Sequence, residues 1–329
     1  MKCCPAFADF TMFTPRSSTF SKLIVVLLML SLGLQACQPP EAAPPPINPT
    51  PEVQATAAIQ QTPTATITPS PTSQPVTIAP ILVTPTNALA LSQRLDQALI
   101  DGVEWYIGIE AEDGKRLLTL NTQESFAPAS MIKIPIALVV LKILEYRGDT
   151  LEVIRKYGIG RNFSELLEAM VVRSEEPATE SLEYFARGEN RLRNYLDWWG
   201  LEHTTFDPRR STVEDLLLSL KLINTQAALN EEFSTYLLDL MSTYTENDQI
   251  LLGVMMDQLP QCVFYNKRGT LLNPTIVSDM GMLKCGEKTW YLVIAGTPAV
   301  ESTATFEDIQ ASIEEFGKVF GGYIQEEQP

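Results

Sequence analysis

The chain has 329 residues, of which 45% are hydrophobic and 8% aromatic; this is enough apolar material for a sizeable core and excludes disorder throughout. Its formal net charge of −16 argues against a nucleic-acid partner, because phosphate binding needs clustered Lys and Arg. The single histidine, His203, excludes a metal site built from several histidines, and we expect neither a metal nor another cofactor.

The first segment, residues 1–36, has the organisation of a signal peptide. Basic residues precede an apolar run over 23–34 that is too short to span a bilayer as a helix. The run leads into Ala36-Cys37, and a small residue followed directly by Cys resembles the lipobox of bacterial lipoproteins. We therefore expect an exported protein, anchored to the membrane by a lipid on Cys37 and facing the cell wall or periplasm. An ordinary signal peptide cut near Ala36 is the alternative.

The next segment, residues 37–87, is predicted to be a disordered tether. It consists mainly of Pro, Thr, Ala and Gln, contains no Lys or Arg, and holds more than half of the prolines of the chain. Such a composition cannot bury enough apolar surface to fold, and it behaves as an extended spacer. The globular domain is therefore expected over residues 88–329.

The domain opens with an amphipathic segment over 88–99, followed by strands over 103–110 and 116–120 that Asp113-Gly114 joins as a hairpin. The later predicted elements are helices over 129–145, 163–172, 179–185, 190–199 and 213–223, strands over 261–267, 275–284 and 289–295, and a closing helix over 306–316. Strands at both ends with helices between them predict an α/β fold of the α+β type: one antiparallel sheet flanked by helices, plus an inserted helical lobe.

The first candidate chemistry lies where the helix over 129–145 begins. Ser130 opens this helix and Lys133 follows three residues later, so the two side chains share one face. A serine hydroxyl needs a neighbouring base to act as a nucleophile, and a lysine desolvated among apolar residues can lose its proton and serve as that base. The alternative is an N-cap serine beside a surface lysine, but the apolar neighbours of Lys133 disfavour it.

Two further motifs follow in chain order. Ser174-Glu175-Glu176 begins 44 residues after Ser130, at a predicted helix start, and Lys267-Arg268-Gly269-Thr270 begins another 93 residues along, on a predicted strand. With Ser130 and Lys133 as Ser-x-x-Lys, this order resembles the penicillin-recognising serine hydrolases, and class A β-lactamases most of all. The resemblance covers about 88–322 and implies a β-lactamase/transpeptidase-like fold.

The resemblance also implies a role for each motif residue. Ser130 would be the acylated nucleophile and Lys133 its activating base. Ser174 would pass a proton to the leaving amine, while Lys267 would hold this relay and the substrate carboxylate. The backbone N–H groups of Ser130 and Thr270 would form the oxyanion hole, and Gly269, Arg268 and Glu176 would belong to the substrate-binding region. The structural alternatives are a helix cap at Ser174 and an ordinary strand lysine at Lys267.

The second and third motifs depart from the family pattern. Glu175 and Glu176 replace the usual Asp and Asn, and Arg268 replaces a hydroxyl residue. A carboxylate at Glu176 would favour the charged form of Lys133, which would weaken this lysine as a base, and it would repel a substrate carboxylate. We therefore predict that Arg268 forms a bidentate pair with Glu176 or with the substrate itself.

The loop over 201–212 is the larger departure, because it leads almost directly into the next predicted helix. The family pattern Glu-x-x-x-Asn, whose glutamate activates the deacylating water, has no match there. Glu202, Asp207 and Glu214 are candidates only by proximity in sequence, each is better explained as a cap or surface acid, and His203 is a weaker candidate for a general base. Without such a base, the resemblance implies a long-lived acyl-enzyme, as in penicillin-binding proteins.

Two cysteines of the domain, Cys262 and Cys285, lie on or beside neighbouring predicted strands. The midpoint between them falls at Asn273-Pro274, where a turn is expected, so the two cysteines would face each other across the strand pair. In an exported protein this predicts a disulfide that braces the strand of Lys267. Two reduced, buried cysteines are the alternative.

These motifs predict a serine acyl-enzyme hydrolase that acts on the β-lactam amide or on a related cell-wall D-alanyl peptide. One alternative is a D-alanyl-D-alanine carboxypeptidase or transpeptidase of the penicillin-binding type. The other is a catalytically degenerate lipoprotein that binds cell-wall peptide or a protein. The expected partners are a β-lactam or peptidoglycan stem peptide and, through Cys37, the membrane; we expect no nucleic acid and a monomeric protein.

Overall fold

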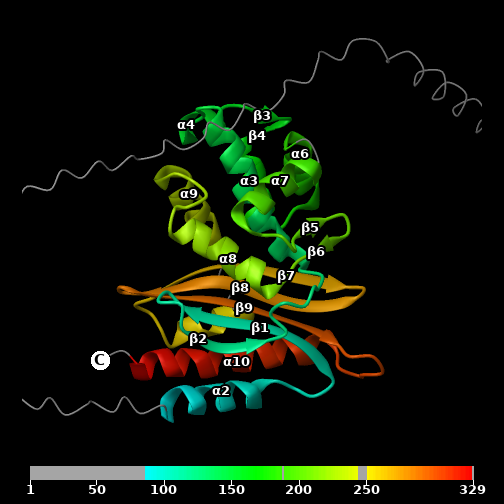
Figure 1. The fold of residues 1–329 in the computed structure, drawn as a ribbon, viewed down its shortest axis with the longest axis vertical. Coiled ribbons are helices and arrows are strands. Elements are labelled where there is room, and N and C mark those ends of the chain that lie inside the picture. Colours follow the sequence, from blue (N-terminus) through cyan, green and yellow to red (C-terminus); the bar gives the residue numbers. More distant parts are fainter. Residues whose placement is uncertain (1–85, 187–188, 244–249, 328–329) are drawn as a thin grey trace, which may run out of the picture. The chain divides into compact units, whose positions relative to one another are not determined.

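A five-stranded antiparallel sheet organises the domain in the computed structural model, which describes residues 86–186, 189–243 and 250–327. The predicted signal peptide, Cys37 and the tether lie outside these residues. The strands run in the order β2-β1-β9-β8-β7, so the N-terminal hairpin pairs with the last strand of the chain (Figure 1). Their bounds are β1 Val103–Ala111, β2 Arg116–Leu120, β7 Val263–Leu272, β8 Thr275–Cys285 and β9 Lys288–Pro298.

The two faces of the sheet carry different layers, and each layer has its own core. One face packs against the helices α2 (Thr86–Ala98) and α10 (Phe306–Glu327) and the 3-10 segment η2 (Leu251–Asp257) (Figure 1). The other face carries the inserted helical lobe. Its helices are α3 Lys133–Tyr146, α4 Leu151–Ile154, α5 Phe163–Val171, α6 Glu176–Phe185, α7 Glu189–Trp199, α8 Val213–Asn224 and α9 Glu231–Ser242. The predicted antiparallel sheet with flanking helices and an inserted lobe is confirmed.

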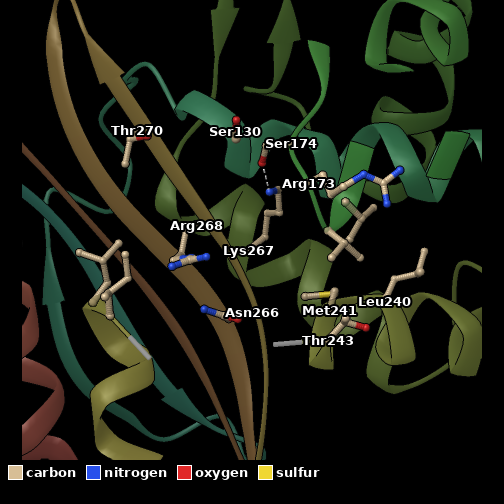
Figure 2. Close-up of a pocket in the computed structure, with 14 residues that line it drawn as sticks. Ser130, Arg173, Ser174, Leu240, Met241, Thr243, Asn266, Lys267, Arg268 and Thr270 are labelled. Carbon is tan, nitrogen blue, oxygen red and sulfur yellow. Dashed lines mark hydrogen bonds between the residues drawn. The ribbon is translucent and has the colours of Figure 1, made fainter. Parts of the chain in front are cut away.

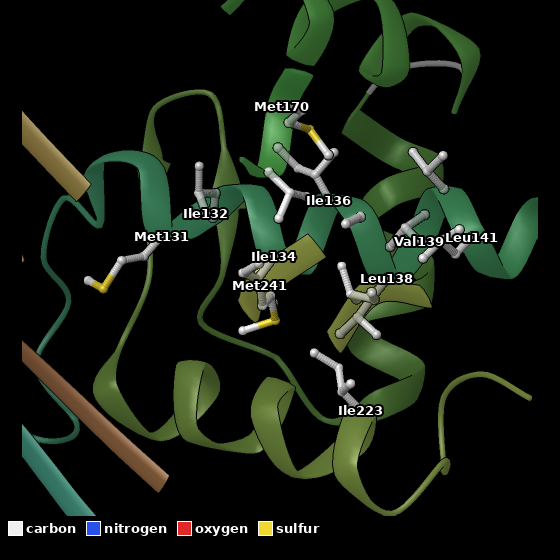
Figure 3. Packing of buried hydrophobic residues seen from close by; sticks show 14 of the residues in the cluster. Met131, Ile132, Ile134, Ile136, Leu138, Val139, Leu141, Met170, Ile223 and Met241 are labelled. Atoms are coloured by element: carbon white, nitrogen blue, oxygen red, sulfur yellow. The ribbon is translucent and has the colours of Figure 1, made fainter. Parts of the chain in front are cut away.

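Helix α3 forms the centre of the lobe because its sequence is apolar on every side. A helix that is hydrophobic all round is stable only when it is buried on all sides. Ile134, Ile136 and Leu138 of α3 are fully buried and lie near Met170 of α5 and Met241 of α9 (Figure 3). The preceding residues form a 3-10 turn, η1 (Ala129–Ile132), rather than the first turn of the predicted helix. The nucleophile motif is therefore fixed to the best-packed element of the lobe.

Two predicted elements extend further than expected, for identifiable reasons. Strand β7 continues past Gly269 to Leu272, because β8 pairs with it along its whole length. Helix α10 continues through Gly317 and Gly321, which would usually mark a helix end. At these two positions an added Cβ would lie 3.1 and 3.0 Å from side-chain atoms of η2, so the glycines let helix and η2 pack closely.

Several elements carry too weak a pattern to be predicted. They are α4, helix α9, η2 and two small hairpins, β3 (Gly158–Ile159) with β4 (Arg161–Asn162) and β5 (Thr205–Phe206) with β6 (Arg209–Arg210). Across the described ranges, the longest helices are too short or too polar to cross a membrane.

A disulfide joins Cys262 to Cys285 at the end of the β7–β8 pair, and Asn273-Pro274 forms the turn at its other end. Replacing both cysteines by alanine should lower the free energy of unfolding by about 3 kcal/mol. The reason is that the disulfide closes the loop between Cys262 and Cys285 and so restricts the unfolded chain. Urea denaturation of the purified protein measures the change. Reduction of the wild type should give a matching loss, whereas free Cys262 and Cys285 thiols in denatured, unreduced protein would contradict the bond.

Candidate active site

A cavity of about 500 Å³ lies between strand β7 and the helical lobe (Figure 2). Ser130, Ser174 and Lys267 all line it, although the chain separates the first from the last by more than a hundred residues. The other lining residues are Val171, Val172, Arg173, Leu240, Met241, Thr243, Ile250, Leu251, Asn266, Arg268 and Thr270. The three motifs therefore meet at one concave site.

Ser130 and Lys133 are in direct contact at the start of α3. The Lys133 Nζ donates a hydrogen bond to Ser130 Oγ over 3.1 Å, and the lysine is only 2% exposed. The turn that presents Ser130 places Ala129 in the left-handed region at φ 48°, a conformation that non-glycine residues adopt only where the surroundings impose it. A hydroxyl within reach of a buried amine is the geometry of an activated nucleophile.

Ser174 and Lys267 form a second hydroxyl–amine pair at the same cavity. Lys267 Nζ donates a hydrogen bond to Ser174 Oγ (Figure 2), and Lys267 is almost fully buried on β7. Ser174 has φ 56° and precedes the first residue of α6, while Glu175 is the N-cap residue of that helix. Ser174 therefore faces the strand lysine instead of capping the helix.

Gly269 allows β7 to run directly against the nucleophile turn. A Cβ at this position would lie 2.9 Å from the backbone nitrogen of Ser130 and 2.7 Å from Ser278 Oγ, so a larger residue would push the strand away. The close approach brings the N–H of Ser130 beside the strand segment that carries Thr270, which lines the cavity. This placement suits the two N–H donors proposed for an oxyanion hole.

The predicted pair between Arg268 and Glu176 is wrong. Glu176 Oε2 lies 2.9 Å from Lys133 Nζ, and its other oxygen lies 2.5 Å from Nη2 of Arg209. Partial burial of Glu176 works against ionisation, but Arg209 and Lys133 outweigh it and hold the pKa of this carboxyl below its usual range. Glu176 thus contacts the base of the nucleophile and is not among the residues that line the cavity.

Glu175 is directed to two arginines of the lobe. Arg161 Nη1 lies 2.9 Å and Arg173 Nε 2.8 Å from its carboxylate oxygens. Hydrogen bonds from Arg173 and Arg161 lower the pKa of the Glu175 carboxyl. This pairing holds the cavity-lining segment around Arg173 in place.

Arg268 lines the cavity from the face of β7 that also carries Asn266, and it stands opposite Asp279 in the register of β8. Asp279 is completely buried and accepts hydrogen bonds from Asn266 Nδ2 at 3.0 Å and from the backbone N–H of Leu252 at 3.2 Å. Burial raises the pKa of Asp279 to about 7, against the opposing effects of the Arg268 charge and these hydrogen bonds.

This raised pKa predicts a pH-dependent stability. The unfolded chain ionises Asp279 near its ordinary pKa of 3.8, whereas the folded protein keeps it protonated up to about 7. The protonated carboxyl therefore favours the folded state at low pH. As the pH rises from the unfolded pKa to the folded pKa, the free energy of unfolding falls by about 4 kcal/mol. Asp279→Asn should remove the loss, so its melting temperature relative to wild type should increase from acid to mildly alkaline buffer. Parallel melting curves for the two proteins would contradict the assignment.

The loop over 201–212 does not bring any predicted acid to the nucleophile. Glu202 and Asp207 are exposed, and Glu214 pairs with Arg116 at 2.6 Å. Within the described residues, no hydrogen bond or ion pair joins these acids to the serine or lysine of the first motif. His203 Nδ1 lies 3.7 Å from Asp215, a buried acid that also accepts the backbone N–H of this histidine. Its polar contacts are thus structural ones at the start of the loop.

The residue of this loop that does contact the site is Arg209, which the sequence did not predict. Arg209 lies on the small strand β6 and binds Glu176 of the lobe helix α6. A single arginine in a polar loop has no pattern that would mark it, because its partner is distant in sequence. In the part of the chain that the structure describes, three or more His, Cys, Asp or Glu residues nowhere gather as a metal site would require.

The arrangement of the sheet, the lobe and the two hydroxyl–amine pairs defines the class of protein as a serine hydrolase fold of the β-lactamase type. The model of the beta-lactamase enzyme family matches residues 90–318, and the chain belongs to this family. No curated protein matches the sequence.

Solved structures of the same fold cover most of the domain. The TLA-3 extended-spectrum beta-lactamase is 18% identical with a TM-score of 0.61, and the match covers 72% of this chain and 99% of that one. A representative class A beta-lactamase from Bacteroides cellulosilyticus is 17% identical with a TM-score of 0.61, covering 73% of this chain and 99% of that one. PBP-A is 17% identical with a TM-score of 0.59, covering 78% and 99%. At these identities the likeness establishes the fold.

Proposed function

We propose that this protein is a serine acyl-enzyme hydrolase that is acylated at Ser130 by a β-lactam amide or a related cell-wall D-alanyl peptide, and that releases the acyl group slowly. The hydrogen bond from Lys133 Nζ to Ser130 Oγ, at the wall of a cavity large enough for such a substrate, carries the proposal. Ligand pockets of about 300–1,000 Å³ are typical for molecules of this size.

The geometry supports a complete acylation step. Lys133 takes the proton of Ser130 as Oγ attacks the carbonyl carbon, and the developing negative oxygen is stabilised by the backbone N–H groups of Ser130 and Thr270. When the amide bond breaks, the leaving nitrogen takes a proton from Ser174, the proton that Lys133 took from Ser130 replaces it, and Lys267 holds Ser174 through its hydrogen bond. Lys267 supplies positive charge for a substrate carboxylate, and Arg268 adds to it from the other face of β7, where it lines the same cavity.

Slow release follows from the loop over 201–212. Its acids are exposed or paired elsewhere, and the position next to Lys133 is taken by Glu176 in its bridge with Arg209. A carboxylate bound by two cations is a poor base for activating water. The structural likeness to PBP-A supports a penicillin-binding character, which we extend to this chain.

The test is a time course with a fluorescent penicillin and the purified protein. The sample is denatured at intervals, and the label is followed on a gel before and after a chase with unlabelled penicillin. We expect a label that persists for minutes to hours. Rapid loss of the label would indicate an efficient β-lactamase and overturn slow release. A protein that takes no label would overturn acylation and favour the degenerate binding lipoprotein, for which the bridge between Glu176 and Lys133 is the specific observation.

We further propose that the chain is exported and lipid-anchored through Cys37, on the sequence of its leader. Cells grown with an alkyne fatty acid should incorporate it into the wild type, and the protein should sediment with membranes. Cys37→Ser should lose the fatty acid and appear in the soluble fraction. Equal incorporation into both proteins would contradict the anchor.

A further inference from the structure

Four charged side chains form a chain of ion pairs behind the nucleophile. Lys133 Nζ lies 2.9 Å from Glu176 Oε2, and Arg209 Nη2 lies 2.5 Å from Glu176 Oε1. The same Arg209 nitrogen lies 3.3 Å from Glu183 Oε1. The two carboxylate oxygens of Glu176 therefore contact different cations: Lys133 at the start of α3, and Arg209 in the loop over 201–212.

The bridge changes the charge balance when Lys133 loses its proton. Lys133 is 2% exposed and the Glu176 side chain is 44% exposed, so water screens the charges of this pair only in part. With Arg209 present, a neutral Lys133 leaves Glu176 and Arg209 as an ion pair. Without Arg209, a neutral Lys133 would leave Glu176 as an unpaired carboxylate next to a buried amine. Arg209 therefore favours the form of Lys133 that can accept a proton.

Arg209 is held at this position by the fold of its loop. The loop is fastened at both ends of its small hairpin: Thr204 Oγ1 donates to the buried Asp215 at 2.8 Å, and Ser211 pairs with Phe126 through two backbone hydrogen bonds of 2.9 and 3.0 Å. Phe126 lies four residues before the nucleophile. The loop is thus fixed both to helix α8 and to the segment that leads into η1.

We propose that Arg209 is a positioning residue for acylation: it neutralises Glu176, and this leaves Lys133 free to act as the base for Ser130. The proposal rests on the proposed function and deepens it. The charged groups that face Lys133 are Glu176 from α6 and, through it, Arg209 from β6 and Glu183; Lys267 on β7 is the other buried cation of the site.

The test measures the rate of labelling by fluorescent penicillin across a pH series for Arg209→Met, Glu176→Gln and the double variant. We expect Arg209→Met to slow labelling at neutral pH by about tenfold or more and to move the half-maximal rate about one pH unit toward alkaline. Arg209→Lys should restore the wild-type profile. The double variant should recover the rate, because no carboxylate remains next to Lys133.

Two controls separate this role from a structural one. Arg193→Ala removes an exposed arginine of α7 and should leave the profile unchanged. A merely structural Arg209 would give a lower rate at every pH without a shift, and Glu176→Gln would not relieve it. Either result, or a profile of Arg209→Met that superposes on the wild type, would overturn the proposal.

A second measurement keeps the inference testable if the wild type takes no label. The lowered pKa of Glu176 means that its ion pairs stabilise the folded protein above the unfolded pKa and that this stability is lost as the pH falls. Without Arg209 the pKa of Glu176 is lowered less, so the variant has less of this stability to lose: the melting temperature of Arg209→Met should lie below that of the wild type at neutral pH, and the gap should narrow as the pH falls. An unlabelled wild type overturns the proposed function, whereas a gap between the two melting temperatures that stays constant across the acid range overturns the role of Arg209.

Discussion

Ser130→Ala should abolish covalent labelling by fluorescent penicillin, with a loss beyond about 10³-fold in rate, and should leave the melting temperature almost unchanged. The variant removes the only atom of this residue that can form the acyl bond, while the buried apolar face of α3 stays intact. Gel fluorescence measures the label, and mass spectrometry of the digested wild type should place the adduct on the peptide that contains Ser130.

Ser125→Ala is the matched control, because Ser125 lies close by in the sequence and its hydroxyl accepts only a weak bond from Arg210 at 3.3 Å. It should label at the wild-type rate. Labelling that survives in Ser130→Ala, or an adduct on Ser174, would show that the roles of the two hydroxyls have been exchanged.

Lys133→Met should slow acylation by about 10²–10⁴-fold, the usual contribution of a positioned general base. Methionine keeps most of the apolar stem in the core but removes the nitrogen that contacts Ser130 Oγ. The measurement is the second-order rate of labelling, taken alongside the melting temperature of the variant.

Lys142→Met provides the comparison on the same helix. Lys142 is only partly buried and pairs with Glu145 at 3.1 Å, so its loss should leave the labelling rate unchanged. A rate for Lys133→Met within tenfold of the wild type would mean that another group takes the proton of Ser130, and Lys267 with Ser174 would then be the pair to test.

The sequence predicted most of the sheet and lobe because their signals are local. Apolar periodicity located α3 and α5, and the turn at Asn273-Pro274 fixed the pairing of β7 with β8. Helix α9 was missed although Asn230 caps it by accepting the N–H of Phe233, because its polar first turn resembles a loop.

The site was predictable to a lesser degree. Ser130 and Lys133 are three residues apart, so their contact follows from local geometry. The contact between Ser174 and Lys267 spans 93 residues and could be expected only through the family resemblance. Non-local contacts of this kind leave no periodic signal in one sequence.

The error at Arg268 has a simple physical reason. Neighbouring residues of a strand point to opposite faces of the sheet, so Arg268 cannot share the face of Lys267. It lies on the face of Asn266 and Asp279. Glu176 lies in the lobe, on the other face of the sheet. Its second cation is Arg209, a residue of a loop whose sequence has no recognisable pattern.

The pairing of β1 with β9 makes the complete sheet depend on the strand that is synthesised last. The ribosome produces the nucleophile turn before it produces β7, β8 and β9, and the N-terminal hairpin has no sheet partner until β9 exists. Pairings between such distant segments form slowly, since a long loop must close first. Since the nucleophile turn packs against β7 of this sheet, we expect reactivity toward the substrate only after β9 has paired with its neighbours.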